Sequence, residues 1–280
     1  MSANITERDL AVDGGHLRLR DHGGSGRVVL CVPGLSANAT SFDHIAEHLA
    51  GPAFHVVSVD LRGRGFSETT PPGSYGWPAH ARDVLGVARV LGEPVDLVGH
   101  SMGTYVAMAA AAIDGNALRS LVLIDGLGAP DAGAIPPILA ALERLGTTWP
   151  SADAYVEMVR SIGTLTPWSE YWERYLRYDL EDVDGGVRSR TDREAVLEDA
   201  RWGGEHDQRE LWPAVTQPTL LVRAQRPLGE GFIMSAADRD DFLRTHPNAR
   251  GVEVDANHYA VANHPGTAAH IRAFLEAVDA

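Results

Sequence analysis

A serine between two glycines lies where a strand-like stretch of the sequence changes into a helix-like one. Residues 95–99 (VDLVG) are mostly branched and apolar, and the stretch after GHSMG is rich in alanine. In so tight a turn, a side chain at Gly99 or Gly103 would collide with the neighbouring backbone. The turn also strains the serine backbone and projects its hydroxyl beyond the strand end. We therefore predict that Ser101 is a nucleophile, against the alternative of a plain strand-to-helix turn.

Strand-like and helix-like segments alternate along most of the chain, and this alternation determines where such residues lie. The continuous apolar runs are residues 27–33, 54–60, 95–99, 118–125, 218–224 and 249–256. Continuous apolar strands that alternate with helices indicate a parallel sheet covered by helices on both faces. The first two segments, DLAVDG and HLRLRDHG, alternate more strictly between apolar and polar residues. They predict an antiparallel hairpin at the edge of the sheet.

The alternation stops between residues 128 and 212, and aromatic residues concentrate there. This segment fits helices and lacks the apolar runs typical of buried strands. We predict that residues 128–212 form a helical cap over one end of the sheet, inserted between the core segments 1–127 and 213–280.

Four motifs resemble those of the α/β-hydrolase fold in their order and spacing. They are VPGL after an early strand, DLRGRGFS after the next one, GHSMG, and NHY near the end of the chain. The resemblance covers nearly the whole chain and is weakest in the cap. It implies an eight-stranded, mostly parallel sheet with helices on both faces and a nucleophile after the fifth strand.

The resemblance also implies a histidine base after the last strand and an acid that orients this base. A serine hydroxyl is a poor nucleophile until a base removes its proton, and His258 occupies the expected position. The acid of this fold usually follows the seventh strand, but this chain has Arg226 there. The fold's other arrangement places the acid after the sixth strand, where we predict Asp125. Glu230 and Asp238, near the seventh strand, remain alternatives.

Attack of a serine on a carbonyl group produces an oxyanion, which two hydrogen-bond donors must stabilise. The backbone N–H of Met102 lies near the positive end of the predicted helix after the serine. We predict that the N–H of Leu35, in VPGLSAN, is the second donor, because Gly34 allows a close approach of the backbone. Many relatives have histidine before this glycine, where this chain has Pro33, but backbone donors do not depend on that side chain.

The aromatic residues of the cap suggest an apolar or aromatic substrate of moderate size. We expect five side chains to line the substrate pocket, namely His100, Trp149, Trp168, Tyr171 and Tyr259. The alternative is that the aromatic rings of the cap only pack it against the core.

The composition argues against several other kinds of site and partner. The chain has 38 acidic and 24 basic residues and a net charge of −14, which disfavours binding to nucleic acid. Every basic residue is arginine, and without lysine the chain has neither a Schiff-base nucleophile nor a Walker-type phosphate loop. Cys31 is the single cysteine, so an internal disulfide is impossible.

Other features of the sequence argue against membrane, metal and cofactor sites. No segment resembles a secretory signal or a membrane span, which predicts a cytoplasmic protein with no membrane partner. No His, Cys and Asp residues have the spacing of metal ligands, so we expect neither a metal nor a cofactor. The glycines of DLRGRGFS are too irregular for a dinucleotide-binding loop, and we interpret Asp60 and Arg62 as residues that hold neighbouring loops.

Taken together, these residues predict a serine hydrolase that cleaves an ester or lactone of a small to medium apolar molecule through an acyl-enzyme. An amide or carbon–carbon hydrolase and a biosynthetic acyltransferase or cyclase use the same machinery and remain alternatives. So does a ligand receptor that keeps the three residues but turns its ligand over slowly. Serine at this position argues against epoxide and haloalkane hydrolysis, for which relatives of this fold use aspartate.

Overall fold

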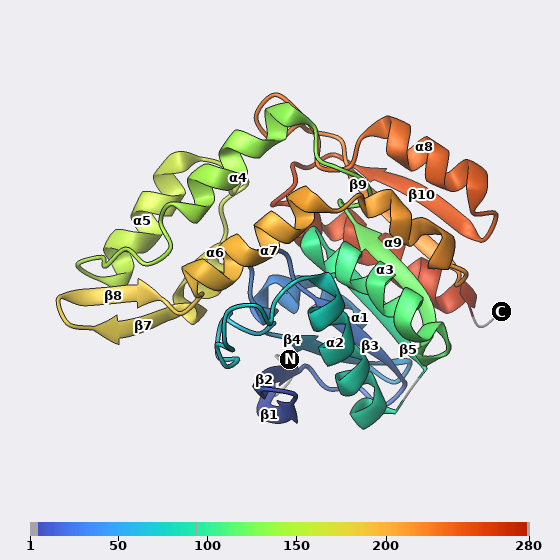
Figure 1. Ribbon diagram of the computed structural model, residues 1–280, viewed down its shortest axis with the longest axis horizontal. Coiled ribbons are helices and arrows are strands. Elements are labelled where there is room, and N and C mark those ends of the chain that lie inside the picture. The colour runs from blue at the N-terminus through green and yellow to red at the C-terminus, as the bar shows by residue number, and fades with distance from the viewer. Residues whose placement is uncertain (1–4, 93, 279–280) are drawn as a thin grey trace.

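The computed structural model describes residues 5–92 and 94–278, and its main sheet has eight strands (Figure 1). Their order is β1-β2-β4-β3-β5-β6-β9-β10. Their bounds are Thr6–Val12 for β1, Gly15–Asp21 for β2, Arg27–Val32 for β3, Phe54–Val59 for β4, Val95–His100 for β5, Leu118–Ile124 for β6, Thr219–Ala224 for β9 and Ala249–Val254 for β10. In this order the strands from β4 to β10 are parallel, while β1 and β2 form the predicted antiparallel edge hairpin. The expected eight-stranded, mostly parallel sheet is confirmed.

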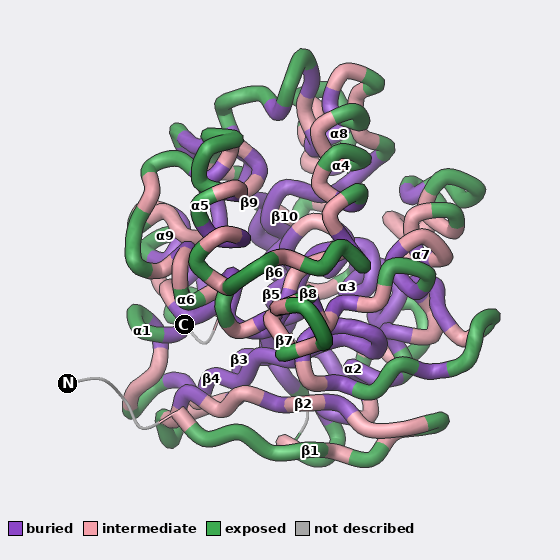
Figure 2. Tube along the Cα trace, turned by 90° about the vertical axis from the view of Figure 1, so that its left-hand side faces the viewer, coloured by how far each residue is buried: buried purple, intermediate pink, exposed green. Residues whose placement is uncertain are grey.

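Helices cover both faces of this sheet, as the continuous apolar strands predict. One face packs against α2 (Trp77–Leu91), α3 (Met102–Asp114) and α8 (Ala236–Thr245). The other face packs against α1 (Asp43–Leu49) and α9 (Pro265–Val278). Successive residues of β3 point to opposite faces, so Leu30 packs in the first layer and Cys31 in the second. Figure 2 shows the central strands buried between these layers and β1 largely exposed at the edge.

The chain between β6 and β9 extends to one side of the sheet (Figure 1) and contains the helices predicted for the cap. They are α4 (Ile135–Leu142), α5 (Ala152–Ile162), α6 (Glu170–Tyr178) and α7 (Arg193–Glu205). A two-stranded hairpin of β7 (Leu180–Val183) and β8 (Gly186–Ser189) was not predicted. Its turn is Asp184-Gly185, a pair typical of tight hairpins, and this was the available signal. The strands bury few residues, so apolar periodicity did not reveal them.

A buried ion pair joins the cap to the core. The guanidinium of Arg64, in the loop after β4, lies 2.6 Å from a carboxylate oxygen of Asp199 on α7, and both side chains are fully buried. His80 Nε2 lies 2.8 Å from the same oxygen, and the second oxygen accepts the N–H of Gly76 at 2.6 Å. Arg64 also donates to the carbonyl of Leu35 at 2.8 and 3.0 Å. One cation therefore connects the cap to the loop that carries a predicted oxyanion donor.

The DLRGRGFS motif makes a second connection between the cap and the core. The carboxylate of Asp60 accepts two backbone N–H groups of neighbouring loops and the hydroxyl of Tyr178 at the end of α6. Burial raises the pKa of Asp60 to about 6. Arg62 donates two hydrogen bonds to the carboxylate of Asp83 on α2. These contacts agree with the interpretation that Asp60 and Arg62 hold neighbouring loops.

Replacing Asp199 by alanine should destabilise the protein, because it leaves the Arg64 guanidinium buried without its counter-ion. Removing one partner of a buried ion pair costs about 3–5 kcal/mol. We expect urea denaturation to show a free energy of unfolding lower by about this amount. The control is Glu194→Ala, at an exposed position of the same helix, which should change the unfolding free energy by less than about 0.5 kcal/mol. Equal stability of the two variants would contradict a stabilising role for the ion pair.

Candidate active site

Ser101 occupies a sharp turn between β5 and α3. Its backbone has φ 56° and ψ −122°, a positive-φ conformation that costs a residue with a side chain about 1–3 kcal/mol. A Cβ atom on Gly99 would lie 2.3 Å from the carbonyl oxygen of Gly103. A Cβ atom on Gly103 would lie 2.1 Å from the carbonyl oxygen of Val32. Both clashes are with backbone, so only glycine fits at these two positions in this turn.

Two further strand ends bring an imidazole and a carboxylate to the serine. His258 follows β10, and its Nε2 lies 3.0 Å from Ser101 Oγ. The Nδ1 of His258 lies 2.9 Å from Oδ2 of Asp125, which follows β6. The other oxygen of Asp125 accepts the backbone N–H of Ala224 at 3.0 Å. The carboxyl ends of parallel strands meet at one edge of a sheet, so residues far apart in the sequence come together there.

This series of hydrogen bonds can convert the serine into a nucleophile. The Asp125 carboxylate accepts the Nδ1–H of His258, which leaves the Nε2 lone pair facing the serine hydroxyl. His258 can then take the proton of Ser101, and the carboxylate stabilises the imidazolium that forms. Both the carboxylate and the imidazole are buried, and weaker solvent screening strengthens their interaction.

The two alternative acids lie elsewhere. Asp238 is in the first turn of α8, and its carboxylate binds Arg209 and Ser235. Glu230 is exposed to solvent. Among the described residues, the carboxylate hydrogen-bonded to His258 is that of Asp125. The structure therefore places the acid after the sixth strand of the sheet against the imidazole.

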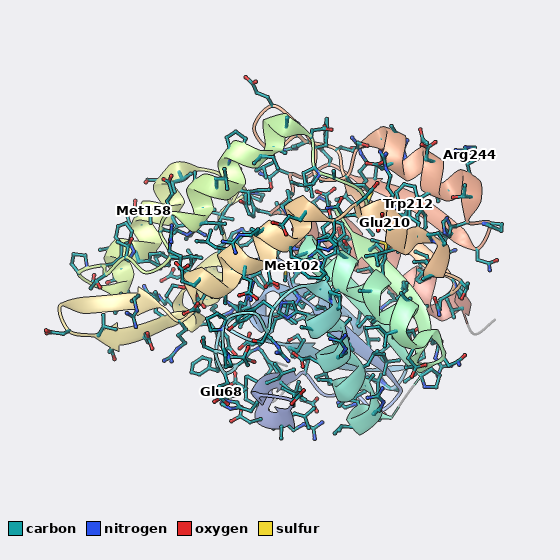
Figure 3. All side chains as sticks on the ribbon, viewed as in Figure 1. Glu68, Met102, Met158, Glu210, Trp212 and Arg244 are labelled. Atoms are coloured by element: carbon teal, nitrogen blue, oxygen red, sulfur yellow. The ribbon has the colours of Figure 1, made fainter. Side chains whose placement is uncertain are left out.

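The two predicted oxyanion donors lie beside the serine. Met102 is the first residue of α3, so its N–H has no acceptor within the helix. Figure 3 labels Met102. Leu35 lies in the loop after β3, and a Cβ on the preceding Gly34 would lie 3.0 Å from Ser101 Cβ. Within the residues that the structure describes, neither N–H has a hydrogen-bond acceptor. Both groups are therefore free to bind a negatively charged oxygen.

His100 supports the loop that carries the imidazole. Its Nε2–H donates to the carbonyl oxygen of His258 at 3.0 Å, and the two rings stack with their centroids 4.9 Å apart. Burial and, to a smaller extent, the nearby His258 lower the pKa of His100 to about 3. His100 therefore stays neutral near neutral pH and holds the His258 backbone as a hydrogen-bond donor.

Comparison with known sequences identifies the family. A sequence model of the alpha/beta hydrolase family matches residues 29–271, which include Ser101, Asp125 and His258. The chain belongs to the alpha/beta hydrolase family. The resemblance noted in the motifs is confirmed over most of the chain.

Two curated relatives extend over most of this alpha/beta hydrolase. N-formylmaleamate deformylase from Pseudomonas putida is 36% identical over 272 residues, which cover 91% of this chain and 90% of the relative. 2-(Acetamidomethylene)succinate hydrolase from Mesorhizobium japonicum is 28% identical over 239 residues, covering 84% and 83% of the two chains. Among solved structures, E-2-(acetamidomethylene)succinate hydrolase is similar with a TM-score of 0.87 and 26% identity. That comparison covers 98% of this chain and 100% of the other.

A cavity of about 910 Å³ lies between the cap and the core of this alpha/beta hydrolase and includes Ser101 in its wall. Its lining is mostly apolar and comes from both parts of the molecule. His100 and Tyr259 line it, as expected. Trp172 and Tyr175 of α6, which were not predicted to do so, also line it. The signal was their spacing, because residues three positions apart lie on one face of a helix.

The expectation for the other three aromatic residues is wrong, because Trp149, Trp168 and Tyr171 do not line the cavity. The ring of Trp149 packs against Tyr155 within the cap, with centroids 5.8 Å apart. The guanidinium of Arg160 lies over the ring of Trp168 at 5.4 Å. The hydroxyl of Tyr171 donates to a carbonyl group of the core. These rings pack the cap against itself and against the core, which was the alternative interpretation.

Neither a metal cluster nor a membrane-spanning helix occurs in the part of the chain that the structure describes. No three His, Cys, Asp or Glu side chains there are arranged to hold a metal ion. No helix among those residues combines the length and the apolar character that crossing a membrane requires. The proton transfer between Ser101 and His258 needs no metal ion.

Replacing Asp125 by asparagine should reduce kcat for hydrolysis of 4-nitrophenyl acetate by about 10⁴-fold, because an amide stabilises the wrong imidazole tautomer. Circular dichroism should show an unchanged fold, since the remaining oxygen still accepts the N–H of Ala224. The matched control is Glu230→Gln, which should keep normal turnover. Normal turnover in Asp125→Asn, with loss of turnover in Glu230→Gln, would show that the catalytic acid lies in the loop after the seventh strand.

Acid should destabilise this protein in part through His100. Between pH 6.5 and about pH 3 the unfolded chain binds a proton at His100 that the folded protein does not, so stability falls as the pH is lowered. From pH 6.5 to pH 5 this loss amounts to about 2 kcal/mol. His100→Gln keeps a donor N–H but cannot titrate, so its loss of unfolding free energy between pH 7 and pH 5 should be smaller by that amount.

Urea denaturation at the two pH values measures this difference. His270→Gln, at an exposed position of α9, is the control and should keep the pH dependence of the unmodified protein. An identical pH dependence in His100→Gln and the unmodified protein would show that His100 protonates equally in the folded and unfolded states.

Proposed function

We propose that this chain is a serine hydrolase that cleaves the bond between an acyl group and nitrogen in a small amide-type compound. The observation that carries the proposal is the distance of 3.0 Å between Ser101 Oγ and His258 Nε2, inside a cavity bordered by two unpaired backbone N–H groups. A nucleophile, a base held by an acid, and an oxyanion site are the three components that acyl transfer requires.

The reaction proceeds through two tetrahedral intermediates. Ser101 Oγ attacks the carbonyl carbon while His258 Nε2 takes its proton, and the N–H groups of Leu35 and Met102 stabilise the oxyanion. His258 then gives the proton to the leaving nitrogen, and an acyl-serine ester remains. A water molecule, deprotonated by His258, attacks this ester and forms the second intermediate. Its collapse releases the carboxylic acid and returns the proton to Ser101.

The choice of a bond to nitrogen is supported by the relatives. The name of one curated relative describes removal of a formyl group from nitrogen, and the name of the other gives a substrate that carries an acetamido group. Amide nitrogen leaves only when protonated, and His258 occupies the position from which it can supply that proton. Esters and lactones use the same steps with a better leaving group, so activated esters serve as reporters of the same site.

The size and lining of the cavity support a small-molecule substrate. A volume of about 910 Å³ lies at the upper end of the usual range for ligand sites, about 300–1,000 Å³. The lining is mostly apolar, with the polar groups concentrated around the nucleophile and in a few cap residues. This arrangement supplies binding area from carbon atoms and orientation from a few polar contacts.

A fluorophosphonate reagent should label Ser101, and mass spectrometry should place the adduct on that residue alone. The unlabelled protein should release formate from N-formylmaleamate and nitrophenolate from 4-nitrophenyl acetate. Ser101→Ala should lower kcat for both reactions by about 10⁵- to 10⁶-fold, because the nucleophile is lost. The control Ser161→Ala, at an exposed position of α5, should behave like the unmodified protein.

Each other outcome has a distinct meaning. A folded protein that the reagent does not label would contradict the proposed nucleophile. Labelling and ester hydrolysis without amide hydrolysis would indicate that the substrate is an ester or a lactone and not an amide. A labelled protein that forms a stable acyl adduct and turns over neither substrate would be a slow-turnover receptor.

A further inference from the structure

Arg144 is a positively charged side chain in the cavity wall that has no counter-ion. It lies just after α4 in the cap and is partly buried. Among the described residues it forms no ion pair, and its Nε is buried without a hydrogen-bond acceptor. The other arginine of the cavity wall, Arg209, is held by Asp238 at 2.6 Å. Arg144 therefore differs from its neighbour in having its charge available.

The carboxylate that interacts electrostatically with Arg144 at longer range is already occupied. Asp179 accepts hydrogen bonds from the hydroxyls of Ser189 and Thr191, one at each oxygen. Burial raises the pKa of Asp179 to about 6, so its negative charge is itself weakened in mildly acidic solution. Asp179 therefore does not neutralise the guanidinium by direct contact.

Three tyrosines interact with the guanidinium, namely Tyr155, Tyr175 and Tyr259, and Tyr155 also forms a side-chain hydrogen bond with it. Burial raises the pKa of each phenol, so all three stay protonated and keep a hydroxyl that can donate. Burial lowers the pKa of Arg144, but the tyrosines raise it and the net change is upward, so the guanidinium keeps its charge. A cation surrounded by hydroxyl donors favours an anionic ligand.

The same tyrosines connect Arg144 to the reacting groups. Tyr259 directly follows His258, and their rings lie edge to face with centroids 5.5 Å apart. Tyr259 also interacts electrostatically with Arg144, and both residues line the cavity that includes Ser101. A small molecule in this cavity can therefore reach Ser101 with one end and Arg144 with the other.

The net negative charge of the molecule makes a local cation important for binding an anion. A net charge of −14 repels anions at long range, so a small anion needs a local positive group to bind. A guanidinium binds a carboxylate through two parallel hydrogen bonds, and an apolar surrounding strengthens that contact. Leaving the guanidinium without a counter-ion in such a surrounding is costly, which favours occupation by a negatively charged ligand.

We propose that Arg144 binds a carboxylate of the substrate, so that this hydrolase selects acyl compounds that carry a negative charge at a distance from the bond that is cleaved. The inference rests on the proposed function of Ser101 and adds a specificity-determining residue to it. The carboxylate does not react, and its binding orients the carbonyl group toward Ser101 and the two N–H donors.

Matched pairs of substrates test this role. One set consists of mono-4-nitrophenyl esters of succinate, glutarate and adipate, and each is compared with the same compound whose free carboxylate is a methyl ester. The measured quantity is the ratio of kcat/KM for the acid to kcat/KM for its methyl ester, with Ser101→Ala as the background. The unmodified protein should favour the acid by at least about tenfold for one chain length.

Arg144→Gln should lower this ratio by about 10- to 100-fold, since the charge-assisted contact is lost. Arg144→Lys keeps the charge without the two-pronged contact, so its ratio should lie between the other two. Arg174→Gln, at an exposed position of α6, removes the same charge outside the cavity and should leave the ratio unchanged. The inference is wrong if the unmodified protein does not favour any acid, or if Arg174→Gln lowers the ratio as much as Arg144→Gln.

A binding measurement separates this inference from the proposed function. Calorimetric titration of glutarate should show binding to the unmodified protein and at least about tenfold weaker binding to Arg144→Gln. If the protein hydrolyses the methyl esters and the acids equally well and does not bind glutarate, the role of Arg144 is wrong, and the proposed function stands. Absence of all hydrolysis, with glutarate binding that depends on Arg144, overturns the proposed function and leaves the anion site. Circular dichroism of Arg144→Gln controls for folding, and the titration of the unmodified protein does not depend on that variant.

Discussion

The hydrogen bond between His258 and Ser101 is the interaction on which the site depends, and the topology of the sheet produces it. The two residues are 157 positions apart in the sequence. They meet because β5, β6 and β10 belong to one sheet of parallel strands whose carboxyl ends share an edge. Ser101 and Asp125 each directly follow a strand and have positive φ. Backbone strain is therefore concentrated at the two strand ends that carry the nucleophile and the acid.

The cap is connected to the reacting groups from both sides. Arg64 binds Asp199 of the cap and the carbonyl of Leu35, whose own N–H borders the cavity. On the other side, the amide of Asn257, next to His258, donates to the carbonyl of Thr164 in the cap at 2.9 Å. The cap therefore closes the cavity and also restrains the two loops that carry an oxyanion donor and the base. A displacement of the cap would change the geometry of both loops.

The walls of the cavity are mostly apolar, and the polar groups at its two ends have separate physical roles. The nucleophile and the two backbone donors act on the carbonyl, while Arg144 and Tyr175 lie in the cap wall and Tyr259 lies next to His258. Apolar area supplies non-directional binding free energy, whereas charged groups determine orientation. Orientation matters most for an amide, because its carbonyl must reach the donors while its nitrogen faces His258.

The sequence alone predicted the strand-turn-helix segment around Ser101, the edge hairpin and the alternation of parallel strands with helices. These features depend on local patterns, namely apolar runs, glycines at a tight turn and residues at strand ends. The roles of Asp125 and His258 came from the resemblance to the α/β-hydrolase fold, with Glu230 and Asp238 left as alternative acids. Which aromatic rings face the cavity follows from the folded structure, because it depends on how each cap helix is rotated against the core. The folded structure also determines that Arg64 pairs with Asp199 and that, among the described residues, Arg144 forms no ion pair, since both depend on distances between segments that no local pattern records.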